Sequence, residues 1–372
     1  MRAQVLEAFN TPYKLKTDAP RPLDPTGCDI LVKVEAASYC HTDAVFASGA
    51  MYQDLPRVGS HEFAGTIMAL GAEVSAELGL SVGLAVGVPG RAFHSCGACQ
   101  ECINNDGDPG RYGVWCTKAG NLGLSADGGF QEYCLVDSRQ VAPMPSELTA
   151  TETAPLMCAG LTIWSALERA KVGMKKGGGE GMTVAISGAG GGLGHLGVQF
   201  AAKLGCGVLA IDASDKALKL LEDVVIELGD DGKRVTIVDA RRQDAQDVRT
   251  SVFGKPEPAL EGEKGVDAAL VLPEAQPALD YAMKLIKNHG TCVLVSFPRD
   301  GFHIQPRDVV FRHIDLVGVL VGRNRQLKAM LQFAATEGVR AKSTIYRLEQ
   351  LNELVDDYHQ GASGKLVVDL LK

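Results

Sequence analysis

The segment TVAISGAGGGLG, residues 183–194, decides the fold class of this 372-residue chain. An apolar, β-prone run ends in a glycine-rich turn, and a helical pattern follows over residues 195–204. Glycines in such a turn let the backbone approach a pyrophosphate, and the helix N-terminus offers free N–H groups. The strict G-x-G-x-x-G spacing is not met, because Leu193 stands where the third glycine would fall and Gly194 follows it. The strand before, the helix after and an acid further on favour a dinucleotide-binding loop over a flexible turn.

That acid is Asp212, which closes the apolar run 208–212 and lies 18 residues after Gly194. A carboxylate at this strand end can accept hydrogen bonds from a ribose 2′-hydroxyl and would repel a 2′-phosphate. No arginine follows Asp212 directly, although Lys216 lies four residues on, so we predict NAD rather than NADP. The residues of this region expected to bind the cofactor are Gly188, Gly190, Gly191, Gly192, Leu193, Gly194, Asp212 and Lys216.

The alternation of strand-like and helical patterns continues after this segment. Apolar runs at residues 208–211 and 268–271 precede helical patterns at residues 216–228 and 275–286. Continuous apolar strands separated by amphipathic helices are typical of a parallel sheet covered on both faces. We therefore predict an α/β fold with a doubly wound sheet from about residue 153 onward.

The residues before about 150 have a different character. They are rich in glycine, proline and short β-prone runs such as residues 63–70, which indicates an irregular, barrel-like β region. The tail carries helical patterns at residues 326–337 and 348–359 and ends in a strand-like run at residues 364–369.

Composition and charge exclude several classes of protein. The net charge of −8 argues against nucleic acid as a partner, because nucleic-acid binders usually carry a basic patch. No run of about 18 apolar residues is present, so we expect no membrane span. The N-terminal residues lack the apolar stretch and cleavage site of a signal peptide, and we expect a cytoplasmic location. The ten cysteines are then more often reduced, metal-bound or catalytic than disulfide-paired.

Cysteine and histidine residues in three separate segments supply the ligands of an open zinc site. Cys40 begins the run CHTD, His61 lies in the run GSHE, and Cys158 begins the run CAG. A catalytic zinc keeps three protein ligands so that water or substrate can take the fourth position. There the metal would act as a Lewis acid on the oxygen of an alcohol or aldehyde.

Three neighbours of these ligands are expected to support them. Thr42 stands two residues from Cys40, so its hydroxyl can reach the reacting oxygen and pass a proton outward. Asp43 and Glu62 are carboxylates of the kind that accept the free N–H of a ligand imidazole, which fixes its tautomer. A surface pair is the alternative for His61 and Glu62, but their small and apolar flanking residues disfavour it.

A second cysteine set indicates a closed, structural zinc site. Cys96, Cys99 and Cys102 form two successive C-x-x-C steps, and four thiolates without an open position describe such a site. A redox-active pair is the alternative, but no thioredoxin-like context surrounds the cluster. The fourth ligand is expected to be Cys116, which follows a long polar stretch whose ordering metal binding must offset. The other cysteines, Cys28, Cys134, Cys206 and Cys292, are interpreted as small hydrophobic residues.

Taken together, these motifs resemble the zinc-dependent medium-chain alcohol dehydrogenases, and the tetrameric yeast-type branch in particular. The resemblance covers nearly the whole chain, and the joint order of its motifs is highly specific. The residues that carry it are 40–43, 59–65, the cysteine cluster, 128–133, 157–162, the glycine loop and 319–325.

The resemblance implies a GroES-like catalytic domain of residues 1–158 and 321–372 and a Rossmann domain of residues 159–320. It implies a cleft between them where zinc meets the nicotinamide, two zinc ions per chain, and a homodimer or homotetramer. It also places His41 near the pyrophosphate of NAD and adds Arg323 and Lys365 to the cofactor-binding residues. Cys158 as the third ligand distinguishes this chain from the polyol dehydrogenases, which tend to carry glutamate there.

Three departures from the family pattern are visible. Val45 stands where yeast-type enzymes usually have a proton-relay histidine, so the proton must leave through solvent or another group. Thirteen residues, rather than seven, separate Cys102 from Cys116. Lys365 replaces a common arginine, which keeps the charge of a phosphate contact but not its bidentate geometry.

The leading hypothesis is therefore an NAD-dependent zinc alcohol dehydrogenase that transfers hydride between a zinc-bound alcohol or aldehyde and the nicotinamide. The departures leave open an aldehyde reductase of a specialised pathway, a catalytically decayed NAD-binding zinc protein, and, more remotely, a zinc-free quinone reductase. Apolar candidates for the substrate pocket are equally compatible with the protein core; they are Phe46, Met51, Tyr52, Phe93, Leu320 and Val321.

Overall fold

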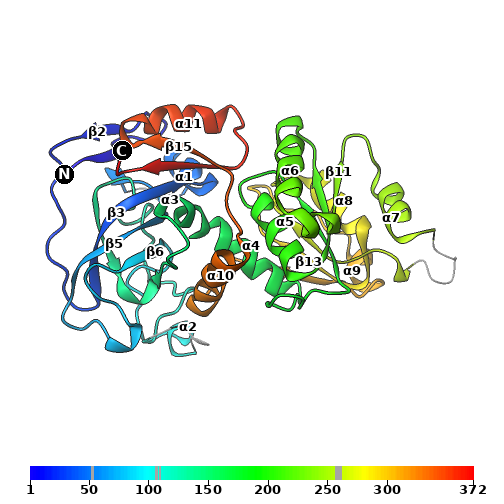
Figure 1. The fold of residues 1–372 in the computed structure, drawn as a ribbon, viewed down its shortest axis with the longest axis horizontal. Helices are drawn as coiled ribbons and strands as arrows, with labels where there is room; N and C mark the ends of the chain where they lie inside the picture. Colours follow the sequence, from blue (N-terminus) through cyan, green and yellow to red (C-terminus); the bar gives the residue numbers. More distant parts are fainter. Residues whose placement is uncertain (52–53, 105–107, 109, 256–261) are drawn as a thin grey trace. The chain divides into compact units, whose positions relative to one another are not determined.

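The computed structural model describes residues 1–51, 54–104, 108, 110–255 and 262–372 (Figure 1). The described chain forms two compact units, one of Met1–Leu161 with Val321–Lys372 and one of Thr162–Leu320. Tyr52, one of the pocket candidates, lies outside the described residues. Within the described ranges, every helix is too short or too polar to cross a membrane.

The second unit is built on a parallel sheet. In spatial order its strands are β11 (Val235–Asp239), β10 (Gly207–Asp212), β9 (Thr183–Ser187), β12 (Val266–Val271), β13 (Ile286–Leu294) and β14 (Asp315–Gly318). Every neighbouring pair in this sheet runs parallel. The order, which is 3-2-1-4-5-6 along the chain, is that of doubly wound dinucleotide-binding folds. The predicted α/β class is therefore confirmed.

Helices connect these strands and cover the sheet. They are α5 (Gly194–Leu204), α6 (Asp215–Glu227), α7 (Ala245–Phe253), α8 (Gln276–Leu285) and α9 (Pro306–Val310). Three successive residues of β10, Leu209, Ala210 and Ile211, are all almost completely buried. Burial of successive residues is expected of a strand that helices cover on both faces, and it explains the continuous apolar runs of the sequence.

The first unit is rich in β-structure. Its larger sheet has the order β15 (Ser343–Arg347), β16 (Lys365–Asp369), β3 (Asp29–Tyr39), β5 (Glu62–Leu70), β6 (Ala85–Pro89) and β8 (Ala142–Pro143), and β7 (Tyr133–Asp137) also pairs with β3. A smaller sheet has the order β2 (Lys14–Lys16), β1 (Ala3–Leu6) and β4 (Arg57–Val58). A core that includes Phe63, Ile67 and Phe130 fills the interior of this unit. The β-rich organisation predicted for the first part of the chain is observed.

The C-terminal tail completes the sheet of the first unit. Strand β16 pairs antiparallel with β3, and Leu366 lies opposite Tyr39. Lys365 therefore reaches the end of β3, where Cys40 follows. The helices of this unit are α1 (His41–Ala47), α2 (Gln100–Ile103), α3 (Ala150–Thr153), α10 (Asn324–Glu337) and α11 (Leu351–His359), and α4 (Ala159–Arg169) contains the boundary between the units.

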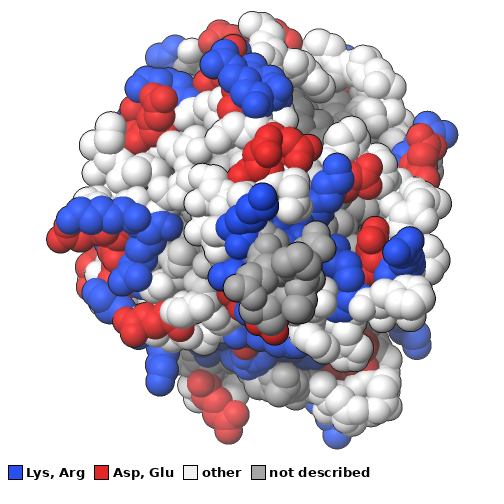
Figure 2. All heavy atoms as spheres, turned by 90° about the vertical axis from the view of Figure 1, so that its right-hand side faces the viewer, with Lys and Arg blue, Asp and Glu red and all other residues white. Residues whose placement is uncertain are grey.

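One face of the molecule shows how charge is distributed (Figure 2). Basic and acidic side chains are interspersed over this face at short distances, shown in blue and red. Such a mixed face differs from the continuous basic patch with which proteins bind nucleic acid.

Candidate active site

The three predicted ligands of the open zinc site come together in the first unit. Cys40 follows β3, His61 precedes β5, and Cys158 precedes α4. Strands β3 and β5 are antiparallel neighbours, so the end of one and the start of the other lie at the same edge of the sheet. The two Sγ atoms and a ring nitrogen of His61 lie within 4.8 Å of one another.

The orientation of His61 is set by a buried carboxylate. Nδ1 of His61 lies 3.3 Å from Oδ1 of Asp43, which has no exposed surface. The same carboxylate accepts hydrogen bonds from the backbone N–H groups of Cys40 and Ser60, at 2.9 and 3.1 Å. Nε2 of His61 is buried and has no hydrogen-bond partner within the part of the chain that the structure describes. A ring held through Nδ1 with Nε2 left over is the arrangement of a metal-ligating histidine.

The donor set fits zinc, for which thiolates and imidazole are common ligands. A hydrogen bond between the two thiols holds the pKa of Cys40 well below its ordinary value and raises that of Cys158 well above. Because zinc binds cysteine as the thiolate, binding of the metal at this site releases thiol protons.

Thr42 and His41 begin α1 directly after Cys40. Oγ1 of Thr42 lies 4.0 Å from Sγ of Cys40, so the hydroxyl lies near the ligand cluster. Its predicted contact with the reacting oxygen stays a prediction. His41 is exposed, and its Nδ1 lies 2.7 Å from the hydroxyl of Tyr358. Sequence reasoning missed Tyr358, because it lies in α11, more than three hundred residues along the chain.

Lys365 lies beside the end of β3, where protein groups surround it. Its side chain is buried, forms an ion pair with Glu62 and donates to the carbonyl of Tyr39 at 3.0 Å. The phosphate contact that the resemblance implies for Lys365 stays a prediction. Burial raises the pKa of Glu62 to about 7 even though Lys365 opposes this shift. Glu62 contacts Lys365 in this structure, and Asp43 is the carboxylate that supports His61.

Replacement of Lys365 by methionine should destabilise the first unit. A buried carboxylate that loses its partner is costly, and we expect the free energy of unfolding to fall by about 3 kcal/mol. Denaturant unfolding of the two proteins would measure this loss. The substitution Lys372→Met is a suitable control, because the same chemical change falls on a side chain that is 64% exposed. Equal stability of both variants would contradict the role of the buried pair.

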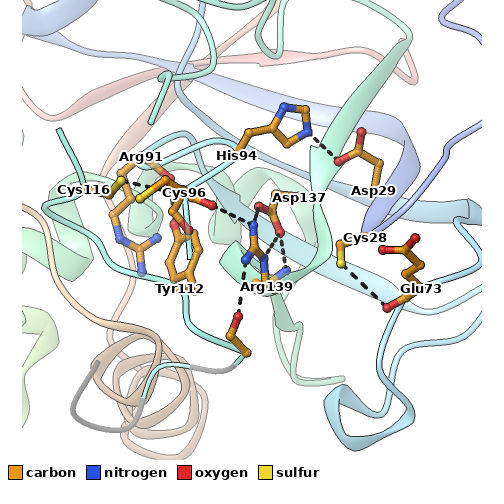
Figure 3. A network of polar contacts seen from close by, with 12 residues as sticks. Cys28, Asp29, Glu73, Arg91, His94, Cys96, Tyr112, Cys116, Asp137 and Arg139 are labelled. Atoms are coloured by element: carbon orange, nitrogen blue, oxygen red, sulfur yellow. Dashed lines mark hydrogen bonds and ion pairs between the residues drawn. The ribbon is translucent and has the colours of Figure 1, made fainter. Parts of the chain in front are cut away.

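The four cysteines of the predicted structural zinc site also come together. The Sγ atoms of Cys96, Cys99, Cys102 and Cys116 lie within 4.8 Å of one another. Sγ of Cys116 accepts a hydrogen bond from the backbone N–H of Cys96 at 3.4 Å (Figure 3). Four closely spaced sulfur atoms form a closed set of the kind that holds structural zinc. The long spacing between Cys102 and Cys116 thus does not prevent Cys116 from reaching the cluster.

Aromatic and polar contacts anchor the long segment between Cys102 and Cys116, of which residues 105–107 and 109 lie outside the description. The hydroxyl of Tyr112 donates to the carbonyl of Arg91 at 2.8 Å, and Arg139 donates to the carbonyl of Gly110 at 3.3 Å (Figure 3). Arg139 is in turn held by Asp137 at 2.6 Å. These partners belong to other parts of the first unit, so tertiary contacts order the described part of the segment.

Arg323 lies in this neighbourhood as well. Its guanidinium lies 4.7 Å from the centre of the Trp115 ring, and Nη1 lies 3.8 Å from the carboxylate of Asp108. The contact with cofactor that the resemblance implies for Arg323 stays a prediction.

The glycine-rich turn lies between β9 and α5 in the second unit. A Cβ atom on Gly194 would lie 2.2 Å from the carbonyl oxygen of Gly188, so no larger residue fits there. Gly194 therefore allows the start of α5 to pack closely against the backbone of Gly188. The third glycine of the usual motif has the same role, one residue earlier in the sequence. Gly191, Gly192 and Leu193 are half-buried at the turn, and a Cβ on Gly190 would lie 2.4 Å from the backbone of Ala217 in α6. This close-packed turn before a helix N-terminus fits the pyrophosphate of a dinucleotide.

Asp212 lies beside the turn, as predicted. Its Oδ2 accepts a hydrogen bond from the N–H of Gly190 at 2.9 Å, and its Oδ1 accepts from the N–H groups of Ala213 and Ser214. A carboxylate has about four acceptor positions, so capacity for a ribose hydroxyl remains. Lys216 is exposed in the first turn of α6. Sequence reasoning missed Arg241, which follows the neighbouring strand β11 and contacts Asp215 and Asp239.

Several other sequence interpretations can be placed in the structure. Phe46 is completely buried in the core, and Phe93 stacks on His94 and lines a cavity of about 460 Å³ in the first unit. Cys134, Cys206 and Cys292 are buried, as interpreted. Cys28 differs, because it is partly exposed and its Sγ lies 3.7 Å from the carbonyl oxygen of Glu73.

Comparison with known proteins identifies the family. The model of the alcohol dehydrogenase GroES-like domain matches residues 26–146, and that of zinc-binding dehydrogenases matches residues 192–336. An alcohol dehydrogenase of Geobacillus stearothermophilus is 32% identical over 371 residues, which cover 99% of each chain. One of Rhizobium meliloti is 31% identical over 100% of this chain and 99% of its own.

A solved structure shows the same fold. The alcohol dehydrogenase of the archaeon Aeropyrum pernix has a TM-score of 0.81 at 27% identity, over 99% of this chain and 100% of that chain. Membership of the yeast-type branch stays a prediction. The two cysteine-containing metal sites, the glycine turn and these similarities agree, and the chain belongs to the zinc-binding alcohol dehydrogenase family, oxidoreductases built from a GroES-like and a Rossmann-type domain.

Proposed function

We propose that this enzyme uses NAD to interconvert an alcohol and an aldehyde or ketone at a zinc ion held by Cys40, His61 and Cys158. The observation that carries the proposal is the close approach of these three side chains, with Nε2 of His61 left without a partner among the described residues. Zinc bound by this set would supply Lewis-acid chemistry to the substrate oxygen.

The remaining residues orient the ligands and move the proton. Asp43 holds the ring of His61 and the backbone of Cys40 in place through its two oxygen atoms. Thr42 places its hydroxyl beside the ligand cluster, where it can take up the proton of a substrate hydroxyl. Val45 offers no acceptor for the next step, so the proton passes from Thr42 to solvent.

The cofactor is proposed to be NAD because Asp212 presents a carboxylate where the adenosine ribose of a dinucleotide binds. A 2′-phosphate beside this carboxylate would place like charges together, which costs several kcal/mol. We therefore expect NADH to bind at least about a hundredfold more tightly than NADPH. Quenching or transfer of protein fluorescence on titration with each nucleotide would measure both dissociation constants. Equal affinities would contradict the assignment of Asp212.

The decisive experiment pairs zinc analysis with an NAD-linked assay on a panel of short, branched and aromatic alcohols. We expect about two zinc ions per chain, one for each ligand set, together with production of NADH. Zinc and tight NADH binding without turnover in either direction would favour a decayed enzyme. Turnover limited to aldehyde reduction would instead support the reductase of a specialised pathway.

We also propose that the enzyme is a homo-oligomer that associates through β14. This strand ends the sheet order of the second unit, and the segment before it exposes Val310 and Phe311 by 69% and 80%. An edge strand beside apolar side chains is a surface that a second copy can cover.

Light scattering should therefore give a mass at least twice that of one chain. The substitution Phe311→Lys should lower this mass, because it places a charge in the proposed interface. Ile226→Lys is the matched control, since Ile226 is 74% exposed but lies on α6. A monomeric parent protein, or equal masses for both variants, would contradict this interface.

A further inference from the structure

A salt-bridged arginine lies beside the proposed ribose site at the edge of the parallel sheet. Arg241 follows β11, and its Nη2 lies 2.5 Å from Oδ1 of Asp215 and 2.8 Å from Oδ2 of Asp239. Its Nε and its backbone N–H donate to Oδ1 of Asp239 at 2.9 and 3.0 Å. One guanidinium is therefore shared by two carboxylates. We call this group of three residues the Asp215–Arg241–Asp239 clamp.

The register of the sheet brings this clamp next to Asp212. Asp212 and Asp239 lie opposite each other on the parallel strands β10 and β11. The N–H of Ala240, the residue before Arg241, donates to the carbonyl of Asp212 at 2.9 Å. Asp215 lies three residues after Asp212, at the first position of α6. Both arms of the clamp thus belong to the strand ends and helix start that surround the ribose site.

An arginine in this position is the residue type that accommodates a 2′-phosphate in NADP-dependent dinucleotide folds. Guanidinium binds phosphate through paired, charge-assisted hydrogen bonds. In this chain, Asp215 and Asp239 already accept hydrogen bonds from Arg241 and balance its charge. The two carboxylates would therefore compete with a phosphate for the same donor groups.

We propose that Arg241 is a latent ligand for a 2′-phosphate, and that Asp215 and Asp239 restrain it so that the clamp reinforces the NAD preference set by Asp212. This inference rests on the NAD use proposed above and adds a second determinant of cofactor choice. Removal of Asp212 alone then leaves the arginine engaged, and a phosphate gains a ligand only when Asp215 is also neutralised.

Binding of 2′,5′-ADP, which carries the 2′-phosphate without the nicotinamide, tests the proposal by titration calorimetry and needs no turnover. The informative variant is D212S/D215N, which neutralises both acids. D212S/D223N is its matched control, because Asp223 lies on the same helix and pairs with Lys219 instead of Arg241. Asp215 is 85% exposed and Asp223 is 54% exposed, so neither substitution disturbs a packed core.

We expect D212S/D215N to bind 2′,5′-ADP at least about tenfold more tightly than D212S/D223N, the gain from one freed charge-assisted contact. Adding R241M to D212S/D215N should remove this gain, and 5′-AMP should bind all variants with similar affinity. Equal binding of 2′,5′-ADP by the two double variants would overturn the proposal. Survival of the gain after R241M would overturn it as well, because another cation would then hold the phosphate.

A separate measurement distinguishes this inference from the proposed function. Tighter binding of NADPH than NADH by the parent enzyme would refute the NAD assignment itself, whatever the clamp does. The substitution R241M in the parent enzyme should leave the affinity for NADH within about threefold, because the donor groups of Arg241 are engaged by Asp215 and Asp239 and NADH has no 2′-phosphate to compete for them. A tenfold loss would show that Arg241 already contacts NADH and is not restrained.

Discussion

The variant Cys158→Ala should contain about one zinc ion per chain and turn over alcohols at least about a thousandfold more slowly, equivalent to about 4 kcal/mol in the activation barrier. Cys158 supplies one of three ligands, and its loss leaves Cys40 and His61 as a site with two donors. The four sulfur atoms of the other site are unaffected, so its zinc should remain. Elemental analysis of the purified protein and the NAD-linked assay give the two values.

The fold should survive this substitution. Cys158 lies just before α4 and is only partly buried, so its thiol contributes little to the core. Cys134→Ala is the control, because Cys134 is a buried cysteine of the same unit that belongs to neither ligand set. It should keep two zinc ions and full turnover. Retained activity in Cys158→Ala would refute the assignment of the catalytic site, and loss of both metals would indicate that the variant has misfolded.

The variant Cys116→Ala should show the opposite pattern: its melting temperature should fall, while its catalytic turnover should be retained. Cys116 closes the set of four thiolates, and structural zinc contributes directly to folding. Without it, the segment between Cys102 and Cys116 must be ordered by contacts such as those of Tyr112 and Arg139 alone. We expect the melting temperature to fall by at least about 10 °C, as for a loss of several kcal/mol in a domain of this size. Calorimetry of the parent and the variant measures the shift.

Zinc content and activity complete this comparison. Cys116→Ala should retain about one zinc ion and measurable turnover at low temperature, because the ligands of the open site are intact. Cys28→Ala is the control, since Cys28 is partly exposed and lies outside both ligand sets. An unchanged melting temperature in Cys116→Ala would mean that three cysteines suffice or that no metal binds there. Chelation of the parent protein should reproduce the fall in melting temperature.

Much of the site was predictable because metal ligation depends on residue type. Only a few types of side chain bind zinc, and cysteine and histidine are the main ones. Cys40, His61, Cys158 and the C-x-x-C steps can therefore be recognised as candidate ligands from residue type and spacing. Local spacing also identified Thr42, which stays beside Cys40 whatever the rest of the chain does. The spacing of Cys116 carries less information, since a thirteen-residue separation does not determine whether the ends of a loop meet. The contacts of Tyr112 and Gly110 supply that information.

The role of each carboxylate was harder to predict. Asp43 and Glu62 each stand next to a zinc ligand in sequence, and both were expected to support an imidazole. The backbone directs Asp43 toward His61 and Glu62 toward Lys365, because β16 pairs with β3 and carries Lys365 to that edge. No local pattern reports which strand of the tail will lie beside β3.

The sequence by itself determined the α/β class, the glycine turn, the acid that follows it and the two sets of cysteine and histidine residues that the structure brings together, since periodicity and residue chemistry are local properties. The tertiary structure alone decided which charged groups meet. Arg241 and Asp215 are 26 residues apart, Lys365 and Glu62 are 303 apart, and each pair is brought together by strand order and register. A side chain reaches a partner this far along the chain only after the sheet has formed, and that is why the partners of Arg241 and Lys365 could not be predicted from the sequence.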